Sequence, residues 1–338
     1  MPNLIPTQPE HSIQDPSKVS DFMLCPRYYF YRHILGWTND LPNVHLIFGE
    51  AWHRGLAHIL RSGDYSLKTA QEAFELHFMP FYEEHYPNRE TDEARAPKTP
   101  GKALEAFVNY VAAHRADADN FRVLHTEIAG AVTLQAEPLL LLHFRMDSII
   151  EDLKKNLFFS LEHKTASRIS QGSLDDFLLS PQIGAYHYAL CCYVPADKVY
   201  GVIVNITALY KSNVPRFERV NCRRGEDDTI VWLEMMLYYL KQLQIERDVL
   251  SIELARTEDV SYDRTMLSFP MRPNACTKWG ITCTYHPFCV AWHNPLKKLS
   301  AYAEAPPAGM KREFWDPRTL EKDAKATLDG SEIKTKEA

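Results

Sequence analysis

Two short segments of the sequence carry side chains that could bind a cation and hydrolyse a phosphodiester. Asp147 stands fifteen residues before Glu162 in the triplet Glu162-His163-Lys164, and both segments are predicted to be β-strands. Because residues i and i+2 of a strand point to the same face, Glu162 and Lys164 share a face and His163 points away. A neighbouring strand carrying Asp147 would place two carboxylates and an ammonium in one pocket. Burying them is costly unless a cation binds the carboxylates, so the pattern predicts a magnesium-dependent phosphodiesterase.

The expected chemistry assigns a role to each of these groups. Magnesium would polarise the phosphate and make a bound water more acidic. Lys164 would orient that water and offset the negative charge of the transition state. The alternative is a solvated surface Glu–Lys pair, with Asp147 an unrelated turn residue, since an E-x-K triplet often occurs by chance.

Three further side chains could complete this site. His53 is a possible nitrogen ligand on an earlier helix, although a lone histidine on a helix is more often packed or exposed. Gln182 and Tyr186 are four residues apart and share a helix face, so both could contact a phosphate or a base. Their alternative interpretation is a core tyrosine beside a surface glutamine.

Four of the seven cysteines form a second constellation. Cys276, Cys283 and Cys289 are separated by six and five residues, which is too wide for zinc knuckles of the C-x₂₋₄-C kind. Three thiolates need a fourth ligand, and Cys25 is the candidate. Four cysteine thiolates are the ligand set of a 4Fe–4S cluster. Zinc and a group of unrelated buried thiols remain the alternatives.

Composition sets limits on the class of protein. The 338 residues carry a formal net charge of −6 and 45% hydrophobic residues, as in an ordinary globular protein, and no stretch reaches the length of a membrane span. The N-terminal residues lack the pattern of a signal peptide, so we expect a cytoplasmic location, in a bacterium or a phage-infected host cell. In that reducing compartment an odd number of cysteines argues for thiolate ligands or buried thiols. The net charge neither favours nor excludes DNA binding.

The rest of the chain predicts the elements that position these residues. Helices are expected at 17–36 (with Ser17 as N-cap), 47–60, 66–86, 103–118, 181–192 (after the N-cap Ser180) and 228–250. Strands are expected at 125–134, 139–150, 156–165, 199–209 and 217–222. This order predicts an α/β fold, with a mixed sheet that carries helices on its faces.

Taken together, the motifs resemble those of the RecB-like branch of the PD-(D/E)XK nucleases that carry an iron–sulfur cluster. This group includes AddB-type nuclease domains, CRISPR-adaptation nucleases and phage exonucleases. The matching segments, in the family's order, are Cys25-Pro26-Arg27-Tyr28, Gly49 to His53, Arg145-Met146-Asp147 (with Phe144 where the family has glycine), Glu162 to Thr165, Gln182 to Tyr186, and Cys276, Cys283 and Cys289. The resemblance spans roughly residues 17–292.

This resemblance implies a restriction-endonuclease-like fold and a set of roles. His53, Asp147 and Glu162 would bind Mg²⁺ or Mn²⁺ together with the backbone carbonyl of His163, and Lys164 would position the water. Gln182 and Tyr186 would contact DNA, and Cys25, Cys276, Cys283 and Cys289 would hold a 4Fe–4S cluster, with zinc as the alternative. The cluster would join the N-terminal helix to the C-terminal loop and so limit the unfolded chain.

The basic-aromatic run from Arg27 to Arg32 has two interpretations. Its aromatic rings and the guanidinium groups of Arg27 and Arg32 could line a channel for single-stranded DNA. Alternatively, the run belongs to an amphipathic helix that packs its tyrosines in the core.

These inferences predict a domain order and a function. The expected regions are an extension at 1–16, a helical region at 17–120 with the first cysteine and the histidine motif, a nuclease core at 121–255, an iron–sulfur loop at 256–300, and a charged, disordered tail at 301–338. The expected function is a metal-dependent DNA exonuclease acting on single strands or DNA ends in recombination, replication or repair. Because no G-x-x-x-x-G-K-[ST] motif is present, it would act on exposed strands or with a helicase or a recombination or annealing protein. The alternatives are a non-catalytic iron–sulfur DNA-binding subunit of a larger complex and a zinc-stabilised interaction module.

Overall fold

The computed structural model describes residues 5, 8–255, 265–278, 281–318 and 324–328. The chain forms two compact units, each of which is described by itself. The first unit comprises Met1–Leu41, Leu134–His143 and Ile230–Thr319, and the second comprises Pro42–Thr133, Phe144–Thr229 and Leu320–Ala338. Among the described residues no helix combines the length and the apolar character that crossing a membrane requires.

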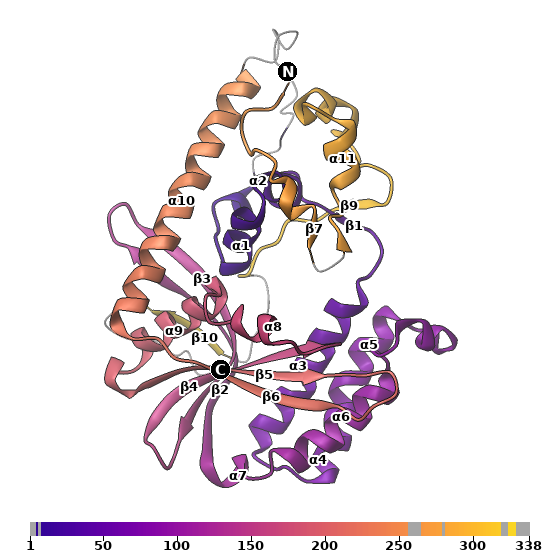
Figure 1. Cartoon of the computed structure of the whole chain (residues 1–338), viewed down its shortest axis with the longest axis vertical. Coiled ribbons are helices and arrows are strands. Elements are labelled where there is room, and N and C mark those ends of the chain that lie inside the picture. Colours follow the sequence, from indigo (N-terminus) through magenta and orange to yellow (C-terminus); the bar gives the residue numbers. More distant parts are fainter. Residues whose placement is uncertain (1–4, 6–7, 256–264, 279–280, 319–323, 329–338) are drawn as a thin grey trace. The chain divides into compact units, whose positions relative to one another are not determined.

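The second unit is built on a mixed β-sheet (Figure 1). Its strands lie in the order β10 (Ala324–Leu328), β2 (Phe121–Gln135), β3 (Leu140–Asp152), β4 (Leu157–Ala166), β5 (Val199–Ala208) and β6 (Arg216–Cys222). β4 and β5 are parallel, as are β10 and β2, whereas β3 and β6 run antiparallel to their neighbours β4 and β5. The predicted α/β class, with a mixed sheet flanked by helices, is confirmed.

A helical crossover joins the parallel strands β4 and β5. It contains α8 (Gln171–Asp175) and α9 (Pro181–Tyr193), and η5 (Ala196–Lys198) leads into β5. As predicted, Ser180 is the N-cap of α9: its side chain accepts a hydrogen bond from the backbone N–H of Ile183. Pro181 occupies the first turn, where a missing N–H costs nothing. α9 packs against both strands that it connects.

A group of helices forms the other part of the second unit. It contains α3 (Val44–Ser62), α4 (Leu67–Glu72), the π-helix η3 (Ala73–Phe78), α5 (Met79–His85), η4 (Arg89–Arg95), α6 (Pro100–Ala113) and α7 (Asp117–Asn120). These helices share an apolar core, in which the rings of Trp52 and Phe107 stack with centroids 4.2 Å apart. α3 passes close to α6 there, because Gly55 has no Cβ.

In the first unit, the predicted helix at 17–36 is interrupted. The structure has α1 (Pro16–Leu24), α2 (Pro26–Tyr29) and the π-helix η2 (Phe30–Ile34). The predicted N-cap Ser17 is wrong: Asp15 caps α1 by accepting from the N–H of Lys18, and Pro16 occupies the first turn. Because Pro26 has no N–H and clashes within a helix interior, the chain breaks before it, which leaves Cys25 in an extended conformation between two helices.

The remaining elements of the first unit come mostly from the C-terminal part of the chain. They are η1 (Pro9–His11), β1 (Trp37–Asn39), most of α10 (Glu226–Ala255), η7 (Pro273–Ala275), β7 (Thr277–Lys278), β8 (Ile281–Thr282), α11 (His286–Ala291), η8 (Pro295–Tyr302) and β9 (Met310–Arg312). Apolar side chains of β1, α10, α11, η8 and β9 share one core with α1, α2 and η2, and this core includes Tyr29, Phe30 and Tyr31. The structure therefore favours the core interpretation of the aromatic run.

Two predicted boundaries differ from the structure. The first cysteine and the histidine motif were expected in one helical region, but Cys25 belongs to the first unit and α3 to the second. The charged segment at 301–338 was expected to be disordered, yet β9 pairs with β1 and β10 pairs with β2. Strand pairing uses backbone groups, so a charged segment can add to a sheet edge. Residues 319–323 and 329–338 of that segment lie outside the described residues.

Substituting the two glycines of α3 should have opposite effects on stability. In Gly55→Ala, the new Cβ would lie 2.3 Å from Cζ of Phe107, whose ring is stacked on Trp52 and cannot move freely. We expect a loss of about 1–3 kcal/mol in the free energy of unfolding. In Gly49→Ala, no atom lies within 4 Å of the new Cβ, so we expect a gain of up to about 1 kcal/mol. Chemical denaturation of both variants checks this; equal changes would contradict the close helix packing.

Candidate active site

Asp147 lies where the hydrogen bonds between β3 and β4 change from backbone pairing to bonds made by side chains. The backbone pairing joins Ile150–Asp152 to Leu157–Phe159, and continuing this register places Asp147 opposite Glu162. Nearer the site, side chains replace the backbone ladder. Ser148 Oγ bonds to both the N–H and the carbonyl of Leu161, and Asp147 Oδ2 accepts from the N–H of His163 at 2.7 Å. This places the Asp147 carboxylate between the two strands.

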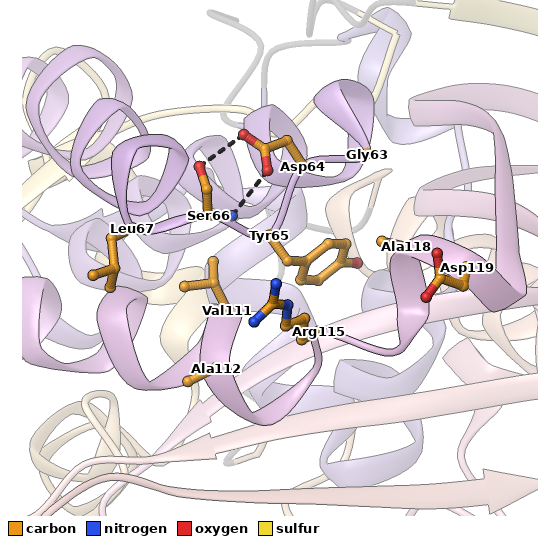
Figure 2. Close-up of a pocket in the computed structure, with 10 residues that line it drawn as sticks. All are labelled: Gly63, Asp64, Tyr65, Ser66, Leu67, Val111, Ala112, Arg115, Ala118 and Asp119. Atoms are coloured by element: carbon orange, nitrogen blue, oxygen red, sulfur yellow. Dashed lines mark hydrogen bonds between the residues drawn. The ribbon is translucent and has the colours of Figure 1, made fainter.

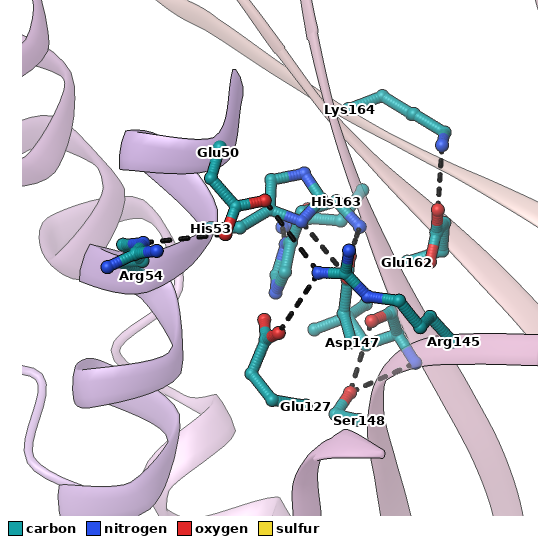
Figure 3. Close-up of polar contacts among 12 residues, drawn as sticks. Glu50, His53, Arg54, Glu127, Arg145, Asp147, Ser148, Glu162, His163 and Lys164 are labelled. Carbon is teal, nitrogen blue, oxygen red and sulfur yellow. Dashed lines mark hydrogen bonds and ion pairs between the residues drawn. The ribbon is translucent and has the colours of Figure 1, made fainter. Parts of the chain in front are cut away.

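His53 of α3 reaches the same carboxylate. Its Nδ1 lies 3.0 Å from Asp147 Oδ1 (Figure 3). Burial lowers the pKa of His53, but the charge and hydrogen bond of Asp147 more than offset this effect and raise the pKa to about 9. Burial raises the pKa of Asp147, but the charge and hydrogen bond of His53, together with the effects of His163, lower it below its usual range. Without a cation, the pair is therefore an imidazolium and a carboxylate. The structure brings these two predicted residues together.

Glu162 and Lys164 share a face of β4, as the strand period predicts. Lys164 Nζ donates to Glu162 Oε1 at 2.7 Å (Figure 3) and to Gln182 Oε1 at 3.1 Å. Gln182 in turn donates to the hydroxyl of Tyr186 at 2.7 Å, so the glutamine–tyrosine pair of α9 lies beside the acid–lysine pair. Burial and the nearby charge of Asp147 raise the pKa of Glu162 to about 7.

Glu127 on β2 is an acid that the sequence analysis missed. One ligand atom from each of His53, Glu127 and Asp147 lies within 4.8 Å of the others. Arg145 Nη2 lies 3.8 Å from Glu127 and 3.7 Å from Glu50, as Figure 3 shows. Glu127 has a φ of +56°, in the left-handed region that side chains rarely adopt within a strand. Such strain persists only where the surroundings enforce it, and it is most often found at functional sites.

The donor set fits a hard divalent cation. Mg²⁺ and Mn²⁺ prefer carboxylate oxygens, and imidazole is an acceptable additional ligand for manganese. Glu162 Oε2 is buried and has no hydrogen-bond partner among the residues that the structure describes. A buried carboxylate oxygen without a donor is unfavourable unless a cation satisfies it. Of the four acidic and imidazole groups here, Glu127 is the one for which sequence spacing gave no signal.

His163 points to the opposite side of β4, as predicted. Its side chain is buried, and its Nδ1 lies 3.0 Å from Nδ2 of Asn205. Burial lowers the pKa of His163 to about 3, so the imidazole is neutral. The backbone N–H of His163, not its ring, bonds to Asp147.

The four predicted cluster cysteines gather in the first unit. Burial raises the pKa of the Cys289 thiol to about 11, and the charges of Cys25, Cys283 and Cys276 raise it as well. Cys283 is affected in the same direction by burial and by Cys25 and Cys276. The backbone N–H of Arg272 donates to Sγ of Cys25 at 3.4 Å. The charges of Cys25 and Cys276 thus act on both Cys283 and Cys289, which places the four thiols in the same region of the first unit.

One of the two arginines predicted to contact DNA is buried. Arg27 has 2% of its surface exposed, and its Nε donates to the carbonyl of Phe269 at 2.9 Å. Its guanidinium also lowers the pKa of Cys289, so this prediction is wrong: Arg27 is an internal charge beside the cysteines. Arg32 is partly exposed and donates to the carbonyl of Glu313 at 3.1 Å. It remains a predicted DNA contact.

A separate pocket of about 560 Å³ lies elsewhere in the second unit (Figure 2). Asp64, Tyr65, Ser66, Arg115 and Asp119 supply its polar groups. Asp64 and Ser66 bond to each other across it. None of the predicted site residues lines this pocket. The groups that could support hydrolysis lie instead around Asp147 and Glu162.

Comparison with known proteins identifies the class of protein. A family profile described as the PD-(D/E)XK nuclease superfamily matches residues 16–290, and the chain belongs to this superfamily. Membership implies metal-dependent nuclease activity, with DNA as the substrate, and such nucleases generally use Mg²⁺ or Mn²⁺. A search of curated proteins found no match. Among solved structures, the crystal structure of SSO0001 is 14% identical; the match covers 50% of this chain and 73% of that one, with a TM-score of 0.25.

The strain at Glu127 predicts an unusual order of stability. Glycine adopts a positive φ at no steric cost, whereas alanine does not. We therefore expect Glu127→Gly to exceed Glu127→Ala by about 1 kcal/mol in the free energy of unfolding, measured with a chelator present. At Thr133, on the same strand and without a positive φ, the order should reverse, with alanine more stable than glycine. The same order at both positions would contradict the strained backbone of Glu127.

Proposed function

We propose that this protein is a metal-dependent DNA exonuclease of the RecB-like branch, acting on single strands or DNA ends in recombination, replication or repair. One observation carries the proposal. Asp147 and Glu162 place a partly buried and a buried carboxylate opposite one another on neighbouring strands, and His53 and Lys164 bond directly to them. A structural ion pair would need one acid, whereas phosphodiester hydrolysis with a divalent cation uses this complete set.

The cation would be held by His53, Asp147, Glu162 and the backbone carbonyl of His163. The position of Glu127 supports adding it to this set. When bound, the metal would polarise the scissile phosphate and make a water more acidic. The proton on His53 must leave before its Nδ1 can bind the cation, because in the metal-free protein that nitrogen bonds to Asp147.

Lys164 and the residues of α9 act on the substrate and the attacking water. The Lys164 ammonium stays charged, since the carboxylate of Glu162 raises its pKa against the effect of burial. It can hold the water and stabilise charge that develops on the phosphate. Gln182 is partly exposed and would contact the DNA strand at the site, whereas Tyr186 is 3% exposed and would act through its hydrogen bond to Gln182. Arg32 would bind phosphate groups from the first unit.

We further propose that Cys25, Cys276, Cys283 and Cys289 hold a 4Fe–4S cluster, with Zn²⁺ as the alternative. The influence of Cys25 and Cys276 on Cys283 and Cys289, and the N–H donated to Cys25, support a shared metal group. A cluster here would join α1 and α2 to the C-terminal segment within the first unit, and the buried charge of Arg27 would offset part of the negative charge of the thiolates. Such thiolates persist in a reducing compartment, which agrees with a cytoplasmic location.

The nuclease should fail when Lys164 is replaced. With Mn²⁺ and end-labelled linear single-stranded DNA, we expect Lys164→Met to lower the cleavage rate by about 10²–10³-fold, because a charge-stabilising donor is lost. Lys154→Met, in the turn between β3 and β4, is the matched control and should cleave at the wild-type rate. Equal cleavage by Lys164→Met and wild type would contradict the proposed site. Binding without cleavage by all three proteins would favour the non-catalytic subunit. Cleavage of circular single strands would contradict exonucleolytic action.

The cluster has its own optical test. Protein purified without oxygen should be brown, with absorbance near roughly 400 nm, as iron–sulfur chromophores show. Cys25→Ser should lose this absorbance and its bound iron, whereas Cys192→Ser, on α9 of the second unit, should keep both. A colourless protein with one zinc per chain would favour the zinc alternative, and the absence of both metals from folded protein would contradict a metal group at these cysteines.

A further inference from the structure

A row of polar residues crosses the sheet beneath the acidic site. His163, Asn205 and Arg219 lie directly opposite one another on the adjacent strands β4, β5 and β6. Both faces of β5 are buried. Asn205 is nevertheless polar and only 1% exposed, and the other buried polar residue of this strand is Thr207.

The hydrogen bonds along this row have a fixed direction. Arg219 can only donate, and its Nε lies 3.3 Å from Oδ1 of Asn205. This orients the amide, so that Nδ2 of Asn205 faces the other way and donates to Tyr110 and to Nδ1 of His163, each at 3.0 Å. Nδ1 must then accept, and the proton of the neutral ring resides on Nε2.

The row is anchored at its far end by an ion pair. Arg219 Nη1 donates to Oδ1 of Asp117 at 3.1 Å, and Nη2 bonds to the other carboxylate oxygen. Asp117 belongs to α7 and Tyr110 to α6, so the helices of the second unit hold the row in place. Both residues of the ion pair are largely buried. A charge pair with two parallel bonds also fixes the orientation of the guanidinium.

The near end of the row is the peptide that shapes the acidic site. The N–H of His163 orients Asp147, and the carbonyl of His163 is a proposed ligand of the cation. The ring of His163 is joined to its own backbone through Cβ. Hydrogen bonds that hold the ring in place therefore also restrain the backbone of His163. Partners behind the direct ligands commonly change metal affinity about 10–100-fold.

We infer that Asn205 is a positioning residue of the nuclease, and that Arg219 and Asp117 orient it. Asn205 holds the ring of His163 as the Nε2–H tautomer and thereby fixes the peptide that organises Asp147 and the metal ligands. This inference rests on the proposed function, because it assigns the row to the same metal site. Asn205 touches neither the metal nor the substrate.

The first experiment measures the affinity for Mn²⁺ by isothermal titration calorimetry, with the full chain. Asn205→Leu removes both amide groups at similar volume, and we expect its affinity to fall about tenfold or more. Thr207→Val is the matched control: Thr207 lies on the same face of β5, is fully buried, and its hydroxyl has no partner among the described residues. Its affinity should equal that of wild type. Folded Asn205→Leu protein with wild-type affinity would overturn the inference.

The second experiment reads the tautomer and does not depend on catalysis. Long-range ¹H–¹⁵N spectra of histidine-labelled protein should show His163 protonated on Nε2, with its signal assigned by its loss in His163→Gln. In Asn205→Asp, the carboxylate keeps its bond to Arg219 but can only accept, so the ring proton should move to Nδ1 while Mn²⁺ affinity is retained. If Asn205→Leu does not fold, this isosteric variant still tests the contact: a ring proton that stays on Nε2 in Asn205→Asp would overturn the inference. A wild-type ring protonated on Nδ1 would overturn the inference, whereas wild-type protein that binds no Mn²⁺ would overturn the proposed function as well.

Discussion

The hydrogen bonds of the Asp147 carboxylate are the interaction on which the candidate site in the second unit depends. The carboxylate spans three elements, because one oxygen bonds to His53 on α3 and the other to the peptide of His163 on β4, while its own backbone belongs to β3. Where it does so, the bonds between β3 and β4 come from the side chains of Asp147 and Ser148. Because side-chain bonds replace the backbone ladder at this point, charged groups can be placed between the two strands. On the other edge of β4, continuous parallel pairing with β5 keeps the strand from moving.

This arrangement concentrates charge that the surrounding structure must hold. Burial and the charge of Asp147 raise the pKa of Glu162, and the proton on His53 and the ammonium of Lys164 balance the two acids. The positive φ of Glu127 adds a local cost in conformational free energy, and the surrounding sheet holds the residue in this conformation. In the metal-free protein, the acids are therefore balanced by positive groups of the protein. A divalent cation could replace these positive groups without a change in the backbone positions.

The sequence predicted what depends on periodicity. The strand period placed Glu162 and Lys164 on one face, and the cap at Ser180 located α9 and with it Gln182. Glu127 could not be found in this way, because its direction depends on a positive φ that no residue pattern announces for glutamate. Arg27 was misassigned because its partner, the carbonyl of Phe269, is 242 residues away in the chain. Long-range packing of this kind decides whether a basic residue is exposed, and composition does not record it.

The first unit has a consequence for the order in which the protein is made. α1 and α2 are synthesised well before the residues that cover them, such as Phe269, Tyr285 and Phe288, which follow about 250 residues later. At roughly 5–20 residues per second, this interval lasts roughly ten to fifty seconds. During that time the helices around α3 and the strands β2 to β6 can fold on the ribosome, whereas Tyr29, Phe30 and Tyr31 remain uncovered. The segment that forms α1 and α2 is therefore one that a chaperone would protect during this interval, and Cys25 meets Cys276, Cys283 and Cys289 only at the end of it.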